Sequence, residues 1–279
     1  MVLTAVSPGA RIGEIDLPNC TGGVIAHEGG LTAVLEIEPE LDTPAPLPPL
    51  LALLPMAEVG EPPITAQIVV ETVPVSDSAI PARRHGWVAL QAVRTNDRSG
   101  SDVDELRAAL TGAIRRTQRR LGKSGFSSRV LGAQELAGTI EELGYDGEAI
   151  VEEWAHWRTP ACVAVTLSVV ASGDLSVIDR LPEVAGVPTV LALGIRRVGR
   201  GANANATAGA ANTSIESGDQ SGVEVEASVR LVAATQRDAD RAASAVNAAG
   251  AAWGLRLRRM DGEHVHGVAS TLPLGAFLR

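Results

Sequence analysis

The sequence predicts an α+β fold made of two tandem units, each with the ferredoxin-like order β-α-β-β-α-β around mixed or antiparallel sheets. Short β-branched runs alternate with amphipathic segments, and residues 161–258 follow this order. A degraded copy precedes it, with a proline-rich segment in place of the first helix. We place the N-terminal α+β half at residues 1–150 and the C-terminal ferredoxin-like half at residues 151–279.

A β-hairpin and a strand pair are predicted in the N-terminal half. The sequence Glu28-Gly29-Gly30 lies between two β-rich runs, and its glycines supply the positive φ angles of a tight turn. The proline-rich segment follows, with at most a short helix at residues 50–54. The next two strands are rich in β-branched residues and should pair antiparallel. The four strands are expected at residues 24–26, 31–37, 65–73 and 87–93.

The clearest helix of this half begins after Ser101 and Asp102, which are both favourable N-cap residues. Its apolar residues recur at a spacing that places them on one helical face. They are Leu106, Leu110, Ile114 and Leu121. The helix should end near Gly122, a natural residue for the end of a helix, and a strand at residues 129–131 and a helix at 134–143 should follow.

The C-terminal half begins with a nearly continuous apolar run, which is typical of a strand buried on both faces. Its strands are expected at residues 161–170, 189–196, 223–233, 254–258 and 264–270. Helices are expected at residues 174–181 and 237–249, the second closed by Gly250. Residues 199–222 are rich in Gly, Ala, Asn and Ser, a composition that predicts a mobile hairpin loop.

Charge and composition argue against several classes of partner. The chain has 33 acidic and 24 basic residues, a formal charge of −9, so a phosphate backbone would be repelled and nucleic acid is not expected as a partner. No secretory signal opens the sequence, and the most apolar stretch, residues 45–57, is interrupted by prolines and too short to span a bilayer. The chain by itself is expected to be soluble. Cys20 and Cys162 lack CxxC spacing and are expected to be buried thiols.

One motif supports an alternative function as an enzyme. Asp102-Val103-Asp104 has the D-x-D form with which two carboxylates hold a divalent cation, and it would suit a metal-dependent sugar-nucleotide or phosphate-handling enzyme. The motif opens a predicted helix, however, where acidic residues also cap amides and face the positive end of the dipole. Asp238-Ala239-Asp240 repeats the pattern at another helix start. We therefore interpret both as capping positions.

Two further pairs have the spacing of metal ligands. Glu153 and His156 lie three apart, and His264 and His266 alternate on a predicted strand, but neither pair has a third ligand nearby. The common nucleotide-binding and hydrolase motifs do not occur in the sequence. The prediction is therefore a protein that is not an enzyme, and no catalytic, cofactor-binding or metal residue is proposed.

A basic cluster and a tryptophan pair are the candidate interaction features. The cluster lies on the C-terminal half of the clearest helix and comprises Arg115, Arg116, Arg119, Arg120 and Lys123. It is either a solvated face or a docking surface for anionic lipid headgroups or an acidic partner. Trp154 and Trp157 lie three apart between the two halves and would share one turn of a helix, either packed across the junction or exposed as a binding pair.

Three segments resemble one known family. They are the opening hairpin from Gly22-Gly23-Val24 to Gly29-Gly30-Leu31-Thr32-Ala33-Val34-Leu35, the junction Glu153-Trp154-Ala155-His156-Trp157-Arg158-Thr159-Pro160, and the ending Gly254-Leu255-Arg256-Leu257-Arg258-Arg259 with Thr271-Leu272-Pro273-Leu274-Gly275. In this order and spacing the sequence is similar to EccE, a component of the type VII (ESX) secretion apparatus of actinobacteria.

The resemblance implies a non-catalytic scaffold in a membrane complex for protein export. It implies partners similar to the EccB, EccC and EccD subunits, a location at the cytoplasmic face of the inner membrane, and two N-terminal transmembrane helices that this sequence does not show. The family offers no catalytic residue for transfer. A third hypothesis, a peptide-binding module that uses an exposed edge strand, stays open at this stage.

Overall fold

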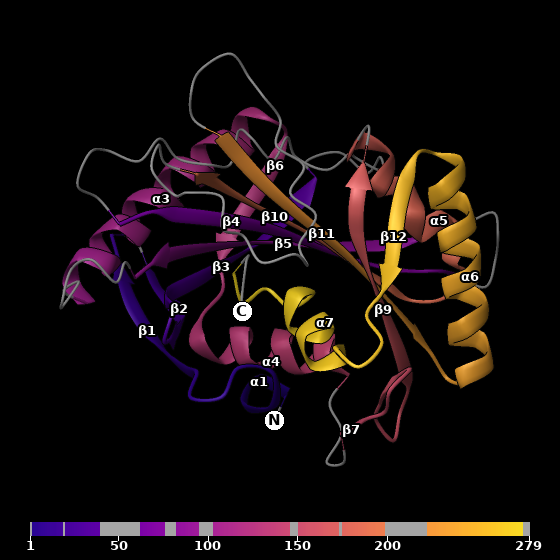
Figure 1. Ribbon diagram of the computed structural model, residues 1–279. Coiled ribbons are helices and arrows are strands. Elements are labelled where there is room, and N and C mark those ends of the chain that lie inside the picture. Colours follow the sequence, from indigo (N-terminus) through magenta and orange to yellow (C-terminus); the bar gives the residue numbers. More distant parts are fainter. Residues whose placement is uncertain are drawn as a thin grey trace.

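The computed structural model confirms the α+β class and shows one large antiparallel sheet of 12 strands with helices on both faces (Figure 1). The structure describes residues 2–18, 20–39, 62–75, 82–94, 103–145, 150–172, 175–198 and 222–275.

In the described part of the chain, six strands come from each half. Those of the first half are β1 (Arg11–Leu17), β2 (Cys20–His27), β3 (Gly30–Pro39), β4 (Ile64–Val73), β5 (Arg83–Val93) and β6 (Phe126–Val130). Those of the second half are β7 (Val151–Glu152), β8 (Trp157–Arg158), β9 (Val163–Ser172), β10 (Thr189–Val198), β11 (Gly222–Ala233) and β12 (Leu255–Arg259). The order across the sheet is β1-β2-β3-β5-β4-β10-β11-β9-β8-β7, with β6 also paired to β3 and β12 also paired to β9.

The two halves meet at the antiparallel pair of β4 and β10 in the middle of the sheet. This pairing runs from Thr189 opposite Thr72 to Ile195 opposite Ala66. On one side of it the strands follow the order β4-β5-β3-β6, and on the other side the order β10-β11-β9-β12. Within the set β3 to β6, and likewise within the set β9 to β12, the second, third, first and fourth strands therefore follow one another outward from the central pair.

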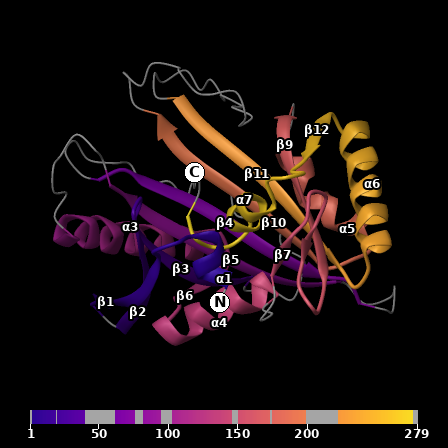
Figure 2. The same cartoon turned by 60° about the horizontal axis from the view of Figure 1, so that its bottom comes forward.

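Four helical segments cover one face of the sheet, called the first face here. They are α3 (Val103–Lys123), the 3-10 helix η1 (Leu175–Arg180), α5 (Leu181–Ala185) and α6 (Gln236–Ala252). Figures 1 and 2 show α3 beside the strands of the first half, and α5 and α6 beside those of the second. The four leucine and isoleucine residues expected on one face of α3 are all buried against these strands, as helical periodicity requires.

The opposite, second face carries α1 (Val2–Val6), α4 (Ala133–Gly144) and α7 (His264–Ser270). Leu136, Ile140 and Leu143 of α4 form a core with Val69 of β4 and Val268 of α7. Because side chains alternate between the faces of a strand, Ile68 and Val70 of β4 join the core of the first face instead. The central strands are therefore buried on both faces, which explains their nearly continuous apolar sequences.

A buried arginine ties three elements together on the second face. Arg230 of β11 is 1% exposed and donates a hydrogen bond to the carbonyl oxygen of Leu143 at 2.5 Å. Its guanidinium lies 6.0 Å from the ring centroid of Tyr145, whose hydroxyl donates to Glu71 of β4 at 3.2 Å. Desolvation lowers the pKa of Arg230 to about 10, so the side chain stays charged at neutral pH. No pattern in the sequence indicates this link.

Most of the elements expected from the sequence are present. The first hairpin, the antiparallel pair of β4 and β5, helix α3, helix α4 and the strands β9, β10, β11 and β12 all occur at the expected places. The helix expected at residues 174–181 is divided between η1 and α5. The expected short helix at 50–54 and the N-cap residues Ser101 and Asp102 lie outside the described residues, as do residues 199–221 of the expected loop.

The prediction of a strand at residues 264–270 is wrong, because this segment forms helix α7. Its alternating residues suit a strand, but packing against the rest of the fold determines that it is a helix. Gly267 lies so close to β9 that a side chain there would meet Thr166 at 2.8 Å, and Val268 and Ala269 are buried. A helix places these small and apolar residues together against the sheet, whereas a strand would alternate them.

Helix α6 continues past Gly250, where the sequence predicted its end. A β-carbon at Gly250 would meet Leu257 at 2.9 Å, so the glycine permits close packing of β12 on the helix. The turn is made instead by Gly254, with a φ of 79°. The sequence also gave no sign of α1, of β1 or of the short hairpin formed by β7 and β8, which are brief or largely exposed elements.

Candidate docking surface

The basic cluster lies on the outer side of α3. Arg115, Arg119 and Lys123 are exposed, and Arg116 and Arg120 are half-buried. Helical geometry separates them from the apolar residues that cover the first face of the sheet. Arg116, Arg119, Arg120 and Lys123 surround a shallow pocket of about 180 Å³. The structure thus brings these cations together on one patch.

The strands beneath α3 direct their carboxylates away from it. In β3, Leu35 and Ile37 join the core under α3, so Glu36 between them points to the second face. Glu36 forms an ion pair there with Arg129. The same alternation applies to all the acidic residues of β1, β3 and β4, which are Glu14, Asp16, Glu36, Glu38 and Glu71. In the described part of the first half, positive charge therefore gathers on the first face.

The structure lends no support to the D-x-D interpretation. Asp102 lies outside the described residues, and Asp104 is exposed in the first turn of α3, 3.7 Å from Arg107. Asp238 lies in the first turn of α6, where Thr235 is the N-cap and accepts from the amide of Asp238 at 3.2 Å. Among the described residues, no group of three or more His, Cys, Asp or Glu side chains is arranged to hold a metal ion.

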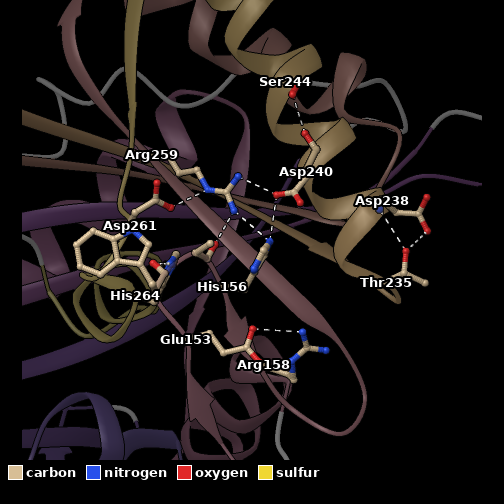
Figure 3. A network of polar contacts seen from close by, with 12 residues as sticks. Glu153, His156, Arg158, Thr235, Asp238, Asp240, Ser244, Arg259, Asp261 and His264 are labelled. Atoms are coloured by element: carbon tan, nitrogen blue, oxygen red, sulfur yellow. Dashed lines mark hydrogen bonds and ion pairs between the residues drawn. The ribbon is translucent and has the colours of Figure 1, made fainter.

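Asp240 was predicted from the sequence to cap its helix, but the N-cap is Thr235. Asp240 anchors a polar network between α6, β12 and the junction of the two halves (Figure 3). Its carboxylate accepts from Arg259 at 2.8 Å and lies 3.0 Å from the Nε2 atom of His156. Burial opposes ionisation of this carboxyl, but the hydrogen bonds from Arg259 and His156 outweigh that effect and lower its pKa. Arg259 also donates to the carbonyl oxygen of Ala155 at 2.5 Å.

Glu153 and His156 do not form the metal pair that their spacing allows. The carboxylate of Glu153 accepts from Arg158 at 2.9 Å, whereas His156 is buried and faces Asp240. The two residues stand at opposite ends of the tight turn between β7 and β8, in which the amide of Glu153 donates to the carbonyl oxygen of His156 at 2.9 Å. The pair therefore shapes this hairpin and its attachment to α6.

The prediction that Trp154 and Trp157 share a helical turn is wrong. They belong to the hairpin of β7 and β8 and point to different surroundings. Trp157 is 2% exposed and packs in the core of the second face, whereas Trp154 is 76% exposed. Core packing across the junction is thus confirmed for Trp157 alone.

His264 and His266 are also separated by the structure, because they lie on α7. His266 is exposed, and His264 is buried with its Nε2 atom 3.1 Å from the carbonyl oxygen of Trp154. Burial disfavours the charged imidazole and lowers the pKa of His264 below its ordinary value of 6.5. This histidine fixes the backbone of the junction as a neutral donor.

Acidification is expected to weaken this attachment. The pKa of His264 is lower in the folded chain than in the unfolded chain. Its contribution to stability is therefore present above about pH 6.5 and is lost as the pH falls through the lowered folded value. His264→Gln should flatten the decrease in melting temperature between about pH 7 and pH 5. The control is His85→Gln, at an exposed histidine of β5. Equal slopes for the wild type and His264→Gln would contradict this assignment.

The ending that carries Thr271-Leu272-Pro273-Leu274-Gly275 crosses the second face of the first half. The Thr32 hydroxyl donates to the carbonyl oxygen of Leu274 at 2.9 Å, and Gln67 accepts from the amide of Gly275 at 3.2 Å. Gln67 also donates to the carbonyl oxygen of Ser270 at 2.8 Å. We call residues 271–275 the C-terminal strap. Buried polar residues within apolar strands were the signal in the sequence that could have revealed it.

The two cysteines differ in environment. Cys162 is buried, as expected, but Cys20 at the start of β2 is exposed, so that expectation was wrong for Cys20. The edge position of Cys20, opposite Leu17 at the turn between β1 and β2, explains its exposure.

The region from β5 to β9, which holds both the basic cluster and the junction hairpin, also carries the similarity to known proteins. Residues 80–169 match the EccE family model. The family is described as "Putative type VII ESX secretion system translocon, EccE". The EccE match confirms the resemblance seen in the sequence, and of the three resembling segments it includes the junction. No curated protein matches the chain. Among the described helices, none is long and apolar enough to cross a membrane.

Proposed function

We propose that the chain is a non-catalytic structural component of a type VII secretion membrane complex, and the EccE match over residues 80–169 is the observation that carries this proposal. The proposed partners are membrane subunits similar to EccB, EccC and EccD, and the proposed location is the cytoplasmic face of the inner membrane. A scaffold needs a rigid body that exposes specific contact surfaces. A 12-stranded sheet covered by helices on both faces supplies such a body.

We further propose that the body consists of two tandem ferredoxin-like units, at residues 1–150 and 151–279. The matching strand orders β4-β5-β3-β6 and β10-β11-β9-β12 support this proposal. So do α3 and α6, which each connect the third and fourth strands of their unit and cover the same face. The expected first helix of the N-terminal unit would fall in residues 40–61, outside the described residues.

The basic cluster of α3 is the docking surface that we propose for this scaffold. Its cations gather at the C-terminal end of a helix, where the helix dipole stabilises positive charge. The neighbouring strand carboxylates of the described residues point to the other face. A partner with an acidic surface would therefore be attracted to this side of α3.

Charge reversal on α3 should remove the chain from the complex. The full-length protein would be tagged, co-expressed with the other membrane subunits of a type VII locus and purified in mild detergent. The wild type should co-purify with them, and the variant should recover about tenfold less of them, because like charges replace complementary ones. The variant carries Glu at positions Arg115, Arg116, Arg119 and Arg120.

The control variant makes the same change of charge elsewhere. It places Glu at four exposed arginines on other elements, Arg11, Arg83, Arg197 and Arg256. Circular dichroism would establish that both variants are folded. Co-purification of the control but not of the α3 variant would support the docking surface. Retention of the α3 variant would contradict the docking surface only, whereas failure of the wild type to co-purify would contradict the secretion proposal itself.

A further inference from the structure

Trp154 is the most exposed of the large apolar side chains in the described part of the chain. It is 76% exposed, compared with 48% for Val151, the next in order. An indole buries a large area when it binds and keeps a polar N–H group for a hydrogen bond. Tryptophan is accordingly enriched among the residues that dominate binding at protein interfaces. Exposed at the tip of the hairpin of β7 and β8, Trp154 is therefore a candidate for a binding contact.

The structure holds the backbone of this exposed residue in place. The carbonyl oxygen of Trp154 accepts from the amide of Gly262 at 2.7 Å and lies 3.1 Å from the Nε2 atom of His264. The next carbonyl oxygen, that of Ala155, accepts from Arg259. These contacts come from α7, from the end of β12 and from the turn that joins them, as the network in Figure 3 shows for His264 and Arg259.

The ring itself also has a fixed support. A β-carbon at Gly262 would lie 2.6 Å from the indole of Trp154, so the backbone of this turn lies directly against the ring. Gly262 has a φ of 73°, a conformation that favours glycine. A side chain that is ordered before binding loses less entropy when a partner covers it. The site therefore has the preorganisation of an interface anchor.

The charges around Trp154 favour a protein partner over a membrane. The surrounding arginines are already paired: Arg158 with Glu153, Arg258 with Glu263, and Arg259 with both Asp240 and Asp261. These three arginines, as the structure describes them, therefore do not form the cluster of unpaired basic residues that binds anionic lipids. A cavity of about 820 Å³ is lined in part by Glu152, His266 and Gly262, the glycine next to the indole, and gives room for a partner segment.

We infer that Trp154 anchors a second docking surface. Its indole inserts into an apolar pocket of a neighbouring protein subunit, and this pocket offers an acceptor for the indole N–H. This inference rests on the proposed function, because the neighbour is another subunit of the secretion complex. The surface is separate from the basic cluster: it lies on the hairpin of β7 and β8, whereas the cluster lies on α3. The two surfaces would fix the orientation of the chain within the complex.

The test uses the same co-purification with Trp154→Ala. We expect about a tenfold or greater loss of the other subunits, as for an interface anchor, and a smaller loss for Trp154→Phe, which keeps an aromatic ring. Val184→Ala, at another exposed apolar residue on α5, is the control and should bind as the wild type does. The melting temperature of Trp154→Ala should stay close to that of the wild type, because little buried surface is removed.

Fluorescence gives an independent measurement. The difference in emission between the wild type and Trp154→Phe reports Trp154, and it should shift to shorter wavelength in the complex. Undiminished co-purification of Trp154→Ala beside a binding wild type would overturn this inference and leave the proposed function intact. Failure of the wild type would overturn both. Binding to vesicles of anionic phospholipid that depends on Trp154 would overturn it in favour of a membrane contact.

Discussion

Replacing Gly30 by alanine is expected to lower the free energy of unfolding by about 3 kcal/mol. Gly30 opens β3 with a φ of 141°, a conformation that other residues rarely adopt. A β-carbon there would lie 2.0 Å from the carbonyl oxygen of Ala92 in β5. Because that atom belongs to the backbone of a central strand, the sheet must deform to admit a methyl group. Denaturation in urea, followed by circular dichroism, would measure the loss.

Gly13→Ala is the matched control for this prediction. Gly13 also lies in a strand, β1, but a β-carbon there would have no atom within 4 Å. This variant should unfold within about 0.5 kcal/mol of the wild type. Similar stabilities for Gly30→Ala and Gly13→Ala would show that β3 and β5 do not approach each other at Gly30 as the structure has them.

The second large effect is expected at Trp157. Trp157→Ala should lower the free energy of unfolding by about 3 to 5 kcal/mol, because a buried indole leaves a cavity that its neighbours fill only in part. Trp157 is 2% exposed in the core of the second face, which it shares with Cys162 and Val232. Thermal and urea unfolding of the purified variant would measure the effect, with its fold at low temperature checked by circular dichroism.

Trp154→Ala is the matched control, since it makes the same substitution three residues away. Its side chain is 76% exposed, so its stability should change by less than about 1 kcal/mol. The two variants should therefore separate stability from binding. Trp157→Ala should unfold more easily, whereas Trp154→Ala should weaken co-purification with the other subunits. Equal destabilisation by both would contradict the arrangement of the hairpin of β7 and β8.

Regular periodicity explains what could be predicted from the sequence. The apolar residues of α3 follow the helical repeat from Leu106 to Leu121, about four turns, and all four residues named from that repeat are buried. The strands β4, β5, β9, β10 and β11 have long β-branched runs, and the Glu28-Gly29-Gly30 turn marks the first hairpin. Local sequence and tertiary structure agree in these elements, so each could be found without knowledge of its neighbours.

The elements that were missed depend on contacts between distant residues. His264 to Ser270 has a strand-like alternation, but its packing on Thr166 makes it a helix. Trp154 and Trp157 have helical spacing, yet the hairpin that contains them is set by Asp240 and Arg259, about 80 to 100 residues away. A pattern read from neighbouring residues contains no information on such partners. The basic cluster could be predicted because its position follows from the periodicity of α3 alone. Its binding partner could not be predicted, because it lies outside the chain.

The C-terminal strap has a consequence for how the chain is made. It covers strands of the first half through Thr32 and Gln67, from which Leu274 and Gly275 are separated by 242 and 208 residues. While the ribosome is still synthesising the second half, this face of the sheet carries α1 and α4 but lacks the strap, whose Leu272 and Leu274 belong to the same apolar core. Contacts of such long separation also form slowly. The nascent protein therefore passes through a period in which chaperones and proteases can bind the incompletely covered face of the sheet. This period ends when the strap leaves the ribosome and packs on the sheet.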